Sequence, residues 1–114
     1  MVYIDTTKEN DITTLKITGE VDASSSIQLD ESLGAVVRQG DPKILIDCSG
    51  LNYISSAGLG VFMSYIDDIK TSNIKMTFFG LSEKVRSVFD ILGLDQLLNI
   101  VTTKKEALSA INEA

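Results

Sequence analysis

The chain has 114 residues, of which 44% are hydrophobic and 23% are charged, and its formal net charge is −6. A chain of this length buries enough surface to fold alone, so residues 1–114 are expected to form a single domain without metals or disulfides. The acidic balance argues against nucleic acid as a partner, because binding to phosphate backbones draws on clustered lysine and arginine. It is compatible with a basic protein partner, and equally with a role in solubility alone.

The absence of histidine narrows the possible chemistry. A Ser/His/Asp relay and most catalytic zinc sites need an imidazole, so neither can be assembled here. The GxG fragment at 58–60 lacks the further glycine or phosphate-binding lysine of a nucleotide loop. We therefore expect no enzyme, no metal and no cofactor, although a small nucleotide-binding module remains an alternative.

The sequence predicts a cytoplasmic protein that does not insert into a membrane. Its apolar runs, such as LGVFM at 59–63, are far shorter than the roughly 18 residues of a membrane span. The first eleven residues lack the basic and apolar segments of a signal peptide. The single cysteine, Cys48, ends an apolar run and is expected to be a buried, inert thiol.

The first part of the chain predicts a hairpin followed by a helix. Alternating apolar residues indicate strands at 2–7 and 12–19, joined by the polar turn KEND. The helix is capped either by Asp22 or by Ser25, which stands in capping-box spacing with Gln28. The residues of its apolar stripe are Leu29, Leu33, Val36 and Val37.

The middle of the chain predicts a buried strand and a second helix. Residues 43–48, KILIDC, are almost continuously apolar, which is typical of a central strand covered on both faces. The segment ISSAG then leads into a helix with apolar residues at helical spacing. These residues, which we assign to the core, are Leu59, Phe62, Met63, Ile66 and Ile69.

The last third of the chain predicts a strand, a helix, a short strand and a final helix. Residues 74–78 alternate as a strand, and Ser82 caps a helix that Gly93 ends in the left-handed conformation. A short strand at 97–101 and a capping box at 103–106 lead into the last helix. The residues expected to point inward from these two helices are Val85, Val88, Phe89, Leu92, Leu108 and Ile111.

The predicted order of elements is ββαβαβαβα. Strand–helix–strand units of this length imply right-handed crossovers and a largely parallel sheet. The fold class is therefore α/β, with a mixed, largely parallel sheet flanked by helices.

The turn after the central strand is the candidate site. Backbone amides at the start of the following helix are free to meet a ligand or partner. Ser56 falls at this start, where a phosphoryl group gains from the unpaired amides and the helix dipole. The small residues Ala57, Gly58 and Gly60 keep the surface around its hydroxyl low. The same pattern also fits an ordinary serine N-cap followed by glycines that admit close packing.

Three separated segments carry a resemblance to a known family. They are GEVDASS at 19–25, ILIDCSGLNYISSAGLGVF at 44–62 and FFGLSEKVRSVFDILGLDQLL at 78–98. Together they resemble the STAS domains of bacterial anti-sigma factor antagonists, over essentially the whole chain. The resemblance implies a mixed sheet flanked by helices and a regulator that is not an enzyme. It also implies that the unphosphorylated protein binds an anti-sigma factor serine kinase and so frees a sigma factor.

The family motif Asp-Ser-Ser/Thr-Gly-Leu-Gly corresponds to residues 55–60 of this chain. The resemblance implies that Ser56 is the phosphorylated residue and that phosphorylation switches partner binding off. Gly58 and Leu59 match the motif and are implied in partner binding. Ser55 replaces the usual aspartate, which either weakens recognition by the kinase or makes Ser55 a competing acceptor.

The loop GEVDASS is implied at the partner-binding end. Asp22 matches an acidic position of the family that lies close to the phosphorylated serine, and Ser24 stands in the same loop. Asp22 can cap the first helix at the same time.

The partners implied by the resemblance are an anti-sigma factor serine kinase and a phosphoserine phosphatase that resets the switch. An alternative is a STAS subunit that regulates or scaffolds a membrane transport complex. Such a subunit would copurify with membrane proteins and tolerate Ser56→Ala.

Overall fold

The computed structural model describes residues 1–112, so the predicted domain of residues 1–114 extends slightly beyond the described part. Its five strands form one sheet of order β1-β2-β3-β4-β5, in which β1 and β2 are antiparallel and the other neighbours are parallel. The strands are β1 Val2–Glu9, β2 Ile12–Val21, β3 Lys43–Ile54, β4 Lys75–Phe79 and β5 Asn99–Ile100.

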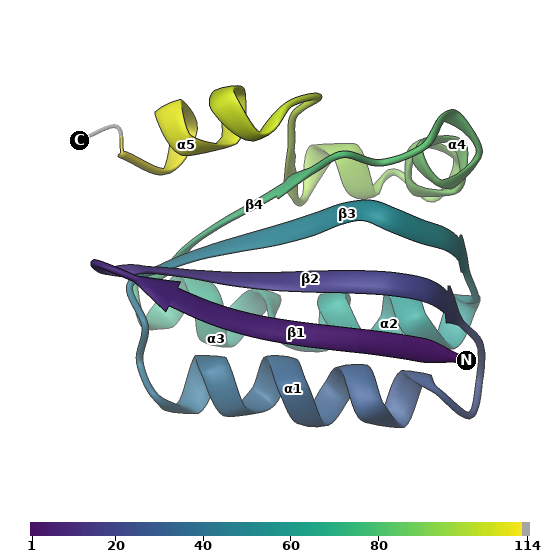
Figure 1. Cartoon of the computed structure of the whole chain (residues 1–114), viewed down its shortest axis with the longest axis horizontal. Helices are drawn as coiled ribbons and strands as arrows, with labels where there is room; N and C mark the ends of the chain where they lie inside the picture. The colour runs from purple at the N-terminus through teal and green to yellow at the C-terminus, as the bar shows by residue number, and fades with distance from the viewer. Residues whose placement is uncertain (113–114) are drawn as a thin grey trace.

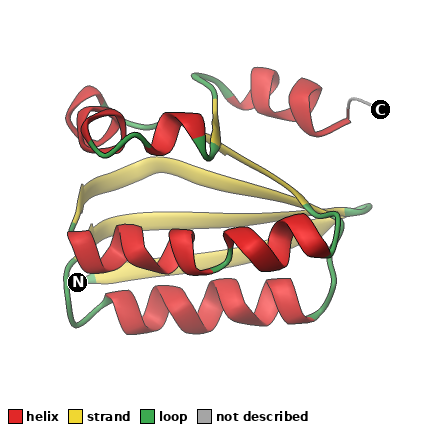
Figure 2. Cartoon of the chain, turned by 180° about the vertical axis from the view of Figure 1, so that it is seen from behind, coloured by secondary structure: helices red, strands yellow, loops and turns green. Residues whose placement is uncertain are grey.

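The helices flank this sheet on both sides. The helix bounds are α1 Ser26–Arg38, α2 Ser56–Ser64, α3 Ile66–Thr71, α4 Glu83–Ile91, the 3-10 turn η1 Leu94–Gln96 and α5 Lys104–Asn112. The helices α1, α2 and α3 lie together along one face, whereas α5 lies on the other side, near β4 (Figures 1 and 2). The predicted mixed sheet and the order ββαβαβαβα are confirmed, with the helix after β3 divided into α2 and α3.

The main core lies between the sheet and the helices α1, α2 and α4. Phe78 of β4 meets Phe62 of α2 and Phe89 of α4 edge-on, with ring centroids 4.9 and 5.9 Å apart. A second, smaller apolar cluster under α5 consists of Leu45, Phe79, Ala107 and Ile111. The strand β3 is therefore covered on both faces, as its continuous apolar sequence predicted. Cys48 is buried in the main core, as predicted, and burial raises the pKa of its thiol, which disfavours the reactive thiolate.

The predicted helix after β3 is interrupted at Tyr65, and the expectation that Met63 is a core residue is wrong. The Tyr65 hydroxyl donates to the carboxylate of Asp30 on α1 at 2.8 Å. A Cβ at Gly34 of α1 would lie 2.6 Å from that hydroxyl, so glycine makes room for the tyrosine. Met63, two residues before this interruption, is 46% exposed, whereas Phe62 is fully buried.

Other differences lie at the ends of elements. The strand β3 runs beyond residue 48 to Ile54, and the short strand predicted at 97–101 covers only residues 99–100 after the turn η1. Leu92 was expected to point inward but is 54% exposed, because α4 ends before it and the chain turns at Gly93 with φ 72°. The predicted caps of α4 and α5 are present, with Ser82 accepting from the Val85 amide and residues 103 and 106 bonding reciprocally.

The predicted capping box of Ser25 and Gln28 does not form. No side-chain hydrogen bond from Ser25 caps α1. Its hydroxyl accepts from the Asp22 amide at 2.9 Å instead. Local side-chain bonds of serine compete with helix capping, and here they hold the loop that precedes α1.

A buried carboxylate ties the β1–β2 hairpin to the loop before β3. Asp41 is 4% exposed and accepts hydrogen bonds from Thr13 Oγ1 at 2.7 Å and from Lys8 Nζ at 3.0 Å. The bond from Thr13, and then the bond from Lys8, hold the pKa of the Asp41 carboxyl below its usual value of 3.8.

We expect Asp41→Asn to lower the free energy of unfolding at pH 7 by about 1 to 3 kcal/mol, because the ionised acceptor of two hydrogen bonds is lost. A lowered pKa in the folded protein means that this contribution is complete above pH 3.8 and fades as the pH falls through the lowered value. Urea unfolding of both proteins from pH 7 to pH 2 checks this, and a difference between them that does not shrink in acid would contradict it.

Candidate functional site

The candidate site lies where β2 and β3 end side by side. The strand register pairs Val21 with Ile54. The next residue after β3, Ser55, donates its amide to the Val21 carbonyl at 2.8 Å. The loop after β2 and the start of α2 therefore meet at one end of the sheet, which brings together the two segments that the sequence singled out.

The two serines at the start of α2 have different surroundings. Ser55 is the N-cap, and its half-buried hydroxyl accepts from the Gly58 amide at 3.2 Å. Ser56 is the first residue of the helix and is exposed, and within residues 1–112 its hydroxyl has no hydrogen-bond partner. The capping role that the sequence left open for Ser56 thus belongs to Ser55, and the Ser56 hydroxyl is available to another molecule.

The two glycines of the motif also differ. A Cβ at Gly58 would lie 2.7 Å from Val21 Cγ1 and 2.8 Å from Ile54 Cγ1, so close packing at the strand ends requires this glycine. A Cβ at Gly60 would meet nothing within 4 Å. Glycine inside a helix is about 1 kcal/mol less favourable than alanine. Gly60 therefore lowers the stability of α2, and no close packing at this position requires it.

Gly58 and Leu59 are both buried. These two residues, predicted to bind the partner, therefore have little surface that a partner could contact. Ala57 and Gly60 are the exposed residues beside Ser56 on α2.

Asp22 lies in the loop beside Ser55 and keeps its negative charge. Its Oδ1 accepts from the Ser25 amide at 2.8 Å and from the hydroxyls of Ser24 and Ser25 at 2.9 Å. These bonds, the Ser25 amide first, lower the pKa of the Asp22 carboxyl to about 2. Ser24, a predicted binding residue, thus contacts Asp22 directly. Asp22 carries its charge at any physiological pH and directly follows Val21, whose carbonyl accepts the Ser55 amide.

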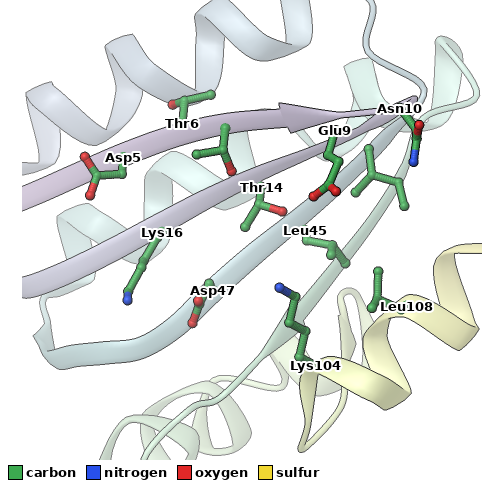
Figure 3. Close-up of a pocket in the computed structure, with 12 residues that line it drawn as sticks. Asp5, Thr6, Glu9, Asn10, Thr14, Lys16, Leu45, Asp47, Lys104 and Leu108 are labelled. Atoms are coloured by element: carbon green, nitrogen blue, oxygen red, sulfur yellow. The ribbon is translucent and has the colours of Figure 1, made fainter.

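A separate groove lies between α5 and the β1–β2 hairpin (Figure 3). It has a volume of about 590 Å³ and contains none of the predicted site residues. Its charged lining residues are Asp5, Glu9, Asp47, Lys16 and Lys104. The excess of carboxylates over lysines does not suit the phosphates of a nucleotide.

No helix within residues 1–112 is long and apolar enough to cross a membrane. The same residues contain no group of three or more metal-ligating side chains placed to hold a metal ion.

The fold and the site define a small mixed α/β domain with a serine at the exposed start of the helix after its central strand. The family model of the STAS domain matches residues 3–107, and the chain therefore belongs to the STAS domain family.

Similar proteins agree with this assignment. The chain is 27% identical over 97 residues to an anti-sigma-B factor antagonist of Staphylococcus epidermidis, which covers 85% of this chain and 90% of that relative. The crystal structure of an anti-sigma factor antagonist from Mycobacterium paratuberculosis matches with a TM-score of 0.91 at 20% identity, over 99% of this chain and 96% of the other. The phosphorylated form of the Bacillus cell fate determinant SpoIIAA matches with a TM-score of 0.73 at 18% identity, over 96% and 100% of the two chains. At these identities the solved structures establish the fold.

The two glycines give a matched pair of stability predictions. We expect Gly58→Ala to lower the free energy of unfolding by about 1 to 3 kcal/mol, because its Cβ overpacks buried side chains. We expect Gly60→Ala to raise it by about 0.5 to 1 kcal/mol, because alanine is the better helix former and the added methyl meets nothing. Urea unfolding measures both, and destabilisation by Gly60→Ala would show that this glycine has a structural role after all.

Proposed function

We propose that this chain is an anti-sigma factor antagonist whose unphosphorylated form binds an anti-sigma factor serine kinase and frees a sigma factor. Phosphorylation of Ser56 switches this binding off. The observation that carries the proposal is the unbonded hydroxyl of Ser56 at the exposed start of α2, at the same sheet edge as the loop that holds the ionised Asp22. A relative named as an anti-sigma-B factor antagonist supports the role, and a solved phosphorylated form of SpoIIAA supports the modification.

The start of α2 can carry a phosphate without loss of the fold. A phosphoserine adds about −1.5 to −2 charges at neutral pH. At residue 56 the phosphate would meet free backbone amides and the positive end of the helix dipole, which favour negative charge. The change would therefore alter the surface while the core stays intact.

The same charge would oppose partner binding. It would add to the charge of Asp22 at this edge of the sheet, on a chain whose net charge is already −6. If a partner has acidic groups facing this edge of the sheet, or if it buries the phosphate without supplying cations, it would bind the phosphorylated chain more weakly, by roughly several kcal/mol. The protein thus acts by binding and release, and a phosphoserine phosphatase would restore the binding form.

The geometry favours Ser56 over Ser55 as the acceptor. The Ser55 hydroxyl is half-buried and is used by the Gly58 amide, so a phosphate on Ser55 would displace the cap of α2. Because Ser55 stands where the family has aspartate, the site has one carboxylate fewer next to Ser56.

The test of this function is a paired capture from lysate of the source organism, with the wild-type chain and Ser56→Glu as baits. We expect an ATP-binding serine kinase with the wild type alone, identified by mass spectrometry, while the circular dichroism of the variant stays native. If both baits recover the same transporter components, the chain is a scaffold subunit of a transport complex instead. Capture of the kinase by both baits equally would refute the switch.

Phosphorylation by the captured kinase should give a single phosphoserine at residue 56. We expect Ser56→Ala to abolish incorporation of phosphate from ATP. Ser55→Ala should keep the acceptor and lose about 1 kcal/mol of stability, because it removes the N-cap of α2. Peptide mapping by mass spectrometry checks the site, and phosphate found on Ser55 of the wild type would refute the assignment.

Gly60 should matter for access to Ser56. An added methyl on this exposed turn of α2 stands in the path of a partner that lies close to the helix. We therefore expect Gly60→Ala to weaken capture of the kinase by about tenfold, a loss of about 1.4 kcal/mol, even though the variant folds more stably. Ser64→Ala, an exposed position at the far end of α2, is the matched control and should bind as the wild type does. Unchanged binding of Gly60→Ala would show that the partner does not lie close to α2 at this turn.

A further inference from the structure

Ser25 is the last residue of the loop that joins β2 to α1, and its side chain bonds to several parts of that loop. Its hydroxyl accepts from the Asp22 amide at 2.9 Å and has two acceptors in reach, the Asp22 Oδ1 at 2.9 Å and the Glu20 carbonyl at 3.1 Å. Its own amide donates to Asp22 Oδ1 at 2.8 Å. Its carbonyl accepts from the amide of Leu29 at 3.3 Å, which begins the hydrogen bonding of α1. One serine therefore joins the end of a strand, the carboxylate of Asp22 and the start of a helix.

This loop is connected directly to the candidate phosphorylation site. Val21 lies between Glu20 and Asp22, the two residues that the Ser25 hydroxyl contacts. The Val21 carbonyl accepts from the Ser55 amide at 2.8 Å, and Ser55 immediately precedes Ser56 and caps α2. The segment 20–22 is therefore joined to the residue that caps α2 by a backbone hydrogen bond, next to the strand pairing of Val21 with Ile54.

We propose that Ser25 is a positioning residue for the switch: it fixes the Asp22 carboxylate and the Val21 carbonyl, and thereby the place of Ser56 relative to Asp22. The sequence pattern assigned Ser25 only to a helix cap, a role that its hydroxyl does not fill. The inference rests on the proposed function, since it concerns how the partner reads Ser56. It assigns Ser25 no contact with the partner.

The structural consequence is testable without any partner. In Ser25→Ala we expect the protection of the Ser55 amide against hydrogen exchange to fall by about tenfold, because the loop that carries its acceptor is loosened. We also expect the pKa of the Asp22 carboxyl to rise from about 2 toward its usual value of 3.8, measured by NMR of the side-chain carboxyl. Ser25→Thr keeps the hydroxyl and should restore both values. Ser24→Ala removes a bond to Asp22 alone and should leave the Ser55 amide protected.

The functional consequence is tested by binding of the variants to the kinase that the wild-type chain captures. We expect Ser25→Ala to bind it about tenfold more weakly, Ser25→Thr to recover the wild-type affinity, and Ser64→Ala to be unaffected. Weaker binding with an unchanged Ser55 amide and an unchanged Asp22 pKa would mean that Ser25 contacts the partner itself, and would overturn the positioning role. Unchanged binding of Ser25→Ala would overturn it as well. If the wild type captures no kinase, the proposed function fails and this inference falls with it, whatever the hydrogen-exchange result.

Discussion

The parallel pairing of β2 with β3 is the constraint on which the site depends. It runs in register from Ile12 beside Lys43 to Val21 beside Ile54, with two irregularities on the way. Both strands therefore end at the same edge of the sheet, and the bond from the Ser55 amide to the Val21 carbonyl closes that edge. Because of this pairing, residues more than thirty positions apart in the chain meet at one edge, where the loop that begins at Asp22 and the start of α2 follow the two strand ends.

The same edge explains why small residues stand where they do. Gly58 has no room for a side chain, since Val21 and Ile54 occupy the space that a Cβ would take. Ser55 takes the capping role, which leaves Ser56 exposed and unbonded at the first position of the helix. Gly60 has open space around it, and no packing contact within the described residues requires a glycine there. Packing, capping and access are thus divided among neighbouring residues of one short motif.

Much of this fold could be predicted from local pattern. The continuous apolar run at 43–48 predicted a doubly covered strand, and the caps at Ser82 and Thr103 followed from residue type and spacing. Features that depend on distant contacts could not be predicted. At the interruption after α2, Tyr65 bonds to Asp30 of the distant helix α1, and Leu92 is exposed just after the end of α4.

The site was predicted only in part, because it also depends on contacts between distant segments of the chain. The motif placed Ser56 at a helix start, but spacing alone does not decide which of two adjacent serines is the cap, or which of two glycines is packed. Those answers depend on the ends of β2 and β3, which only the folded chain brings next to the start of α2. The network around Ser25 was missed because a serine three residues before a glutamine looks like a capping box, whereas Asp22 is the nearer partner of its hydroxyl.

The most direct measurement of the central claim is the dissociation constant of the captured kinase for two forms of the chain, one unmodified and one with phosphoserine incorporated at residue 56 during synthesis. The account predicts that the phosphate weakens binding by at least about a hundredfold, which corresponds to about 2.7 kcal/mol, while the circular dichroism of both forms is the same. Equal affinities of two equally folded forms would contradict it, and would leave Ser56 without a role in partner choice.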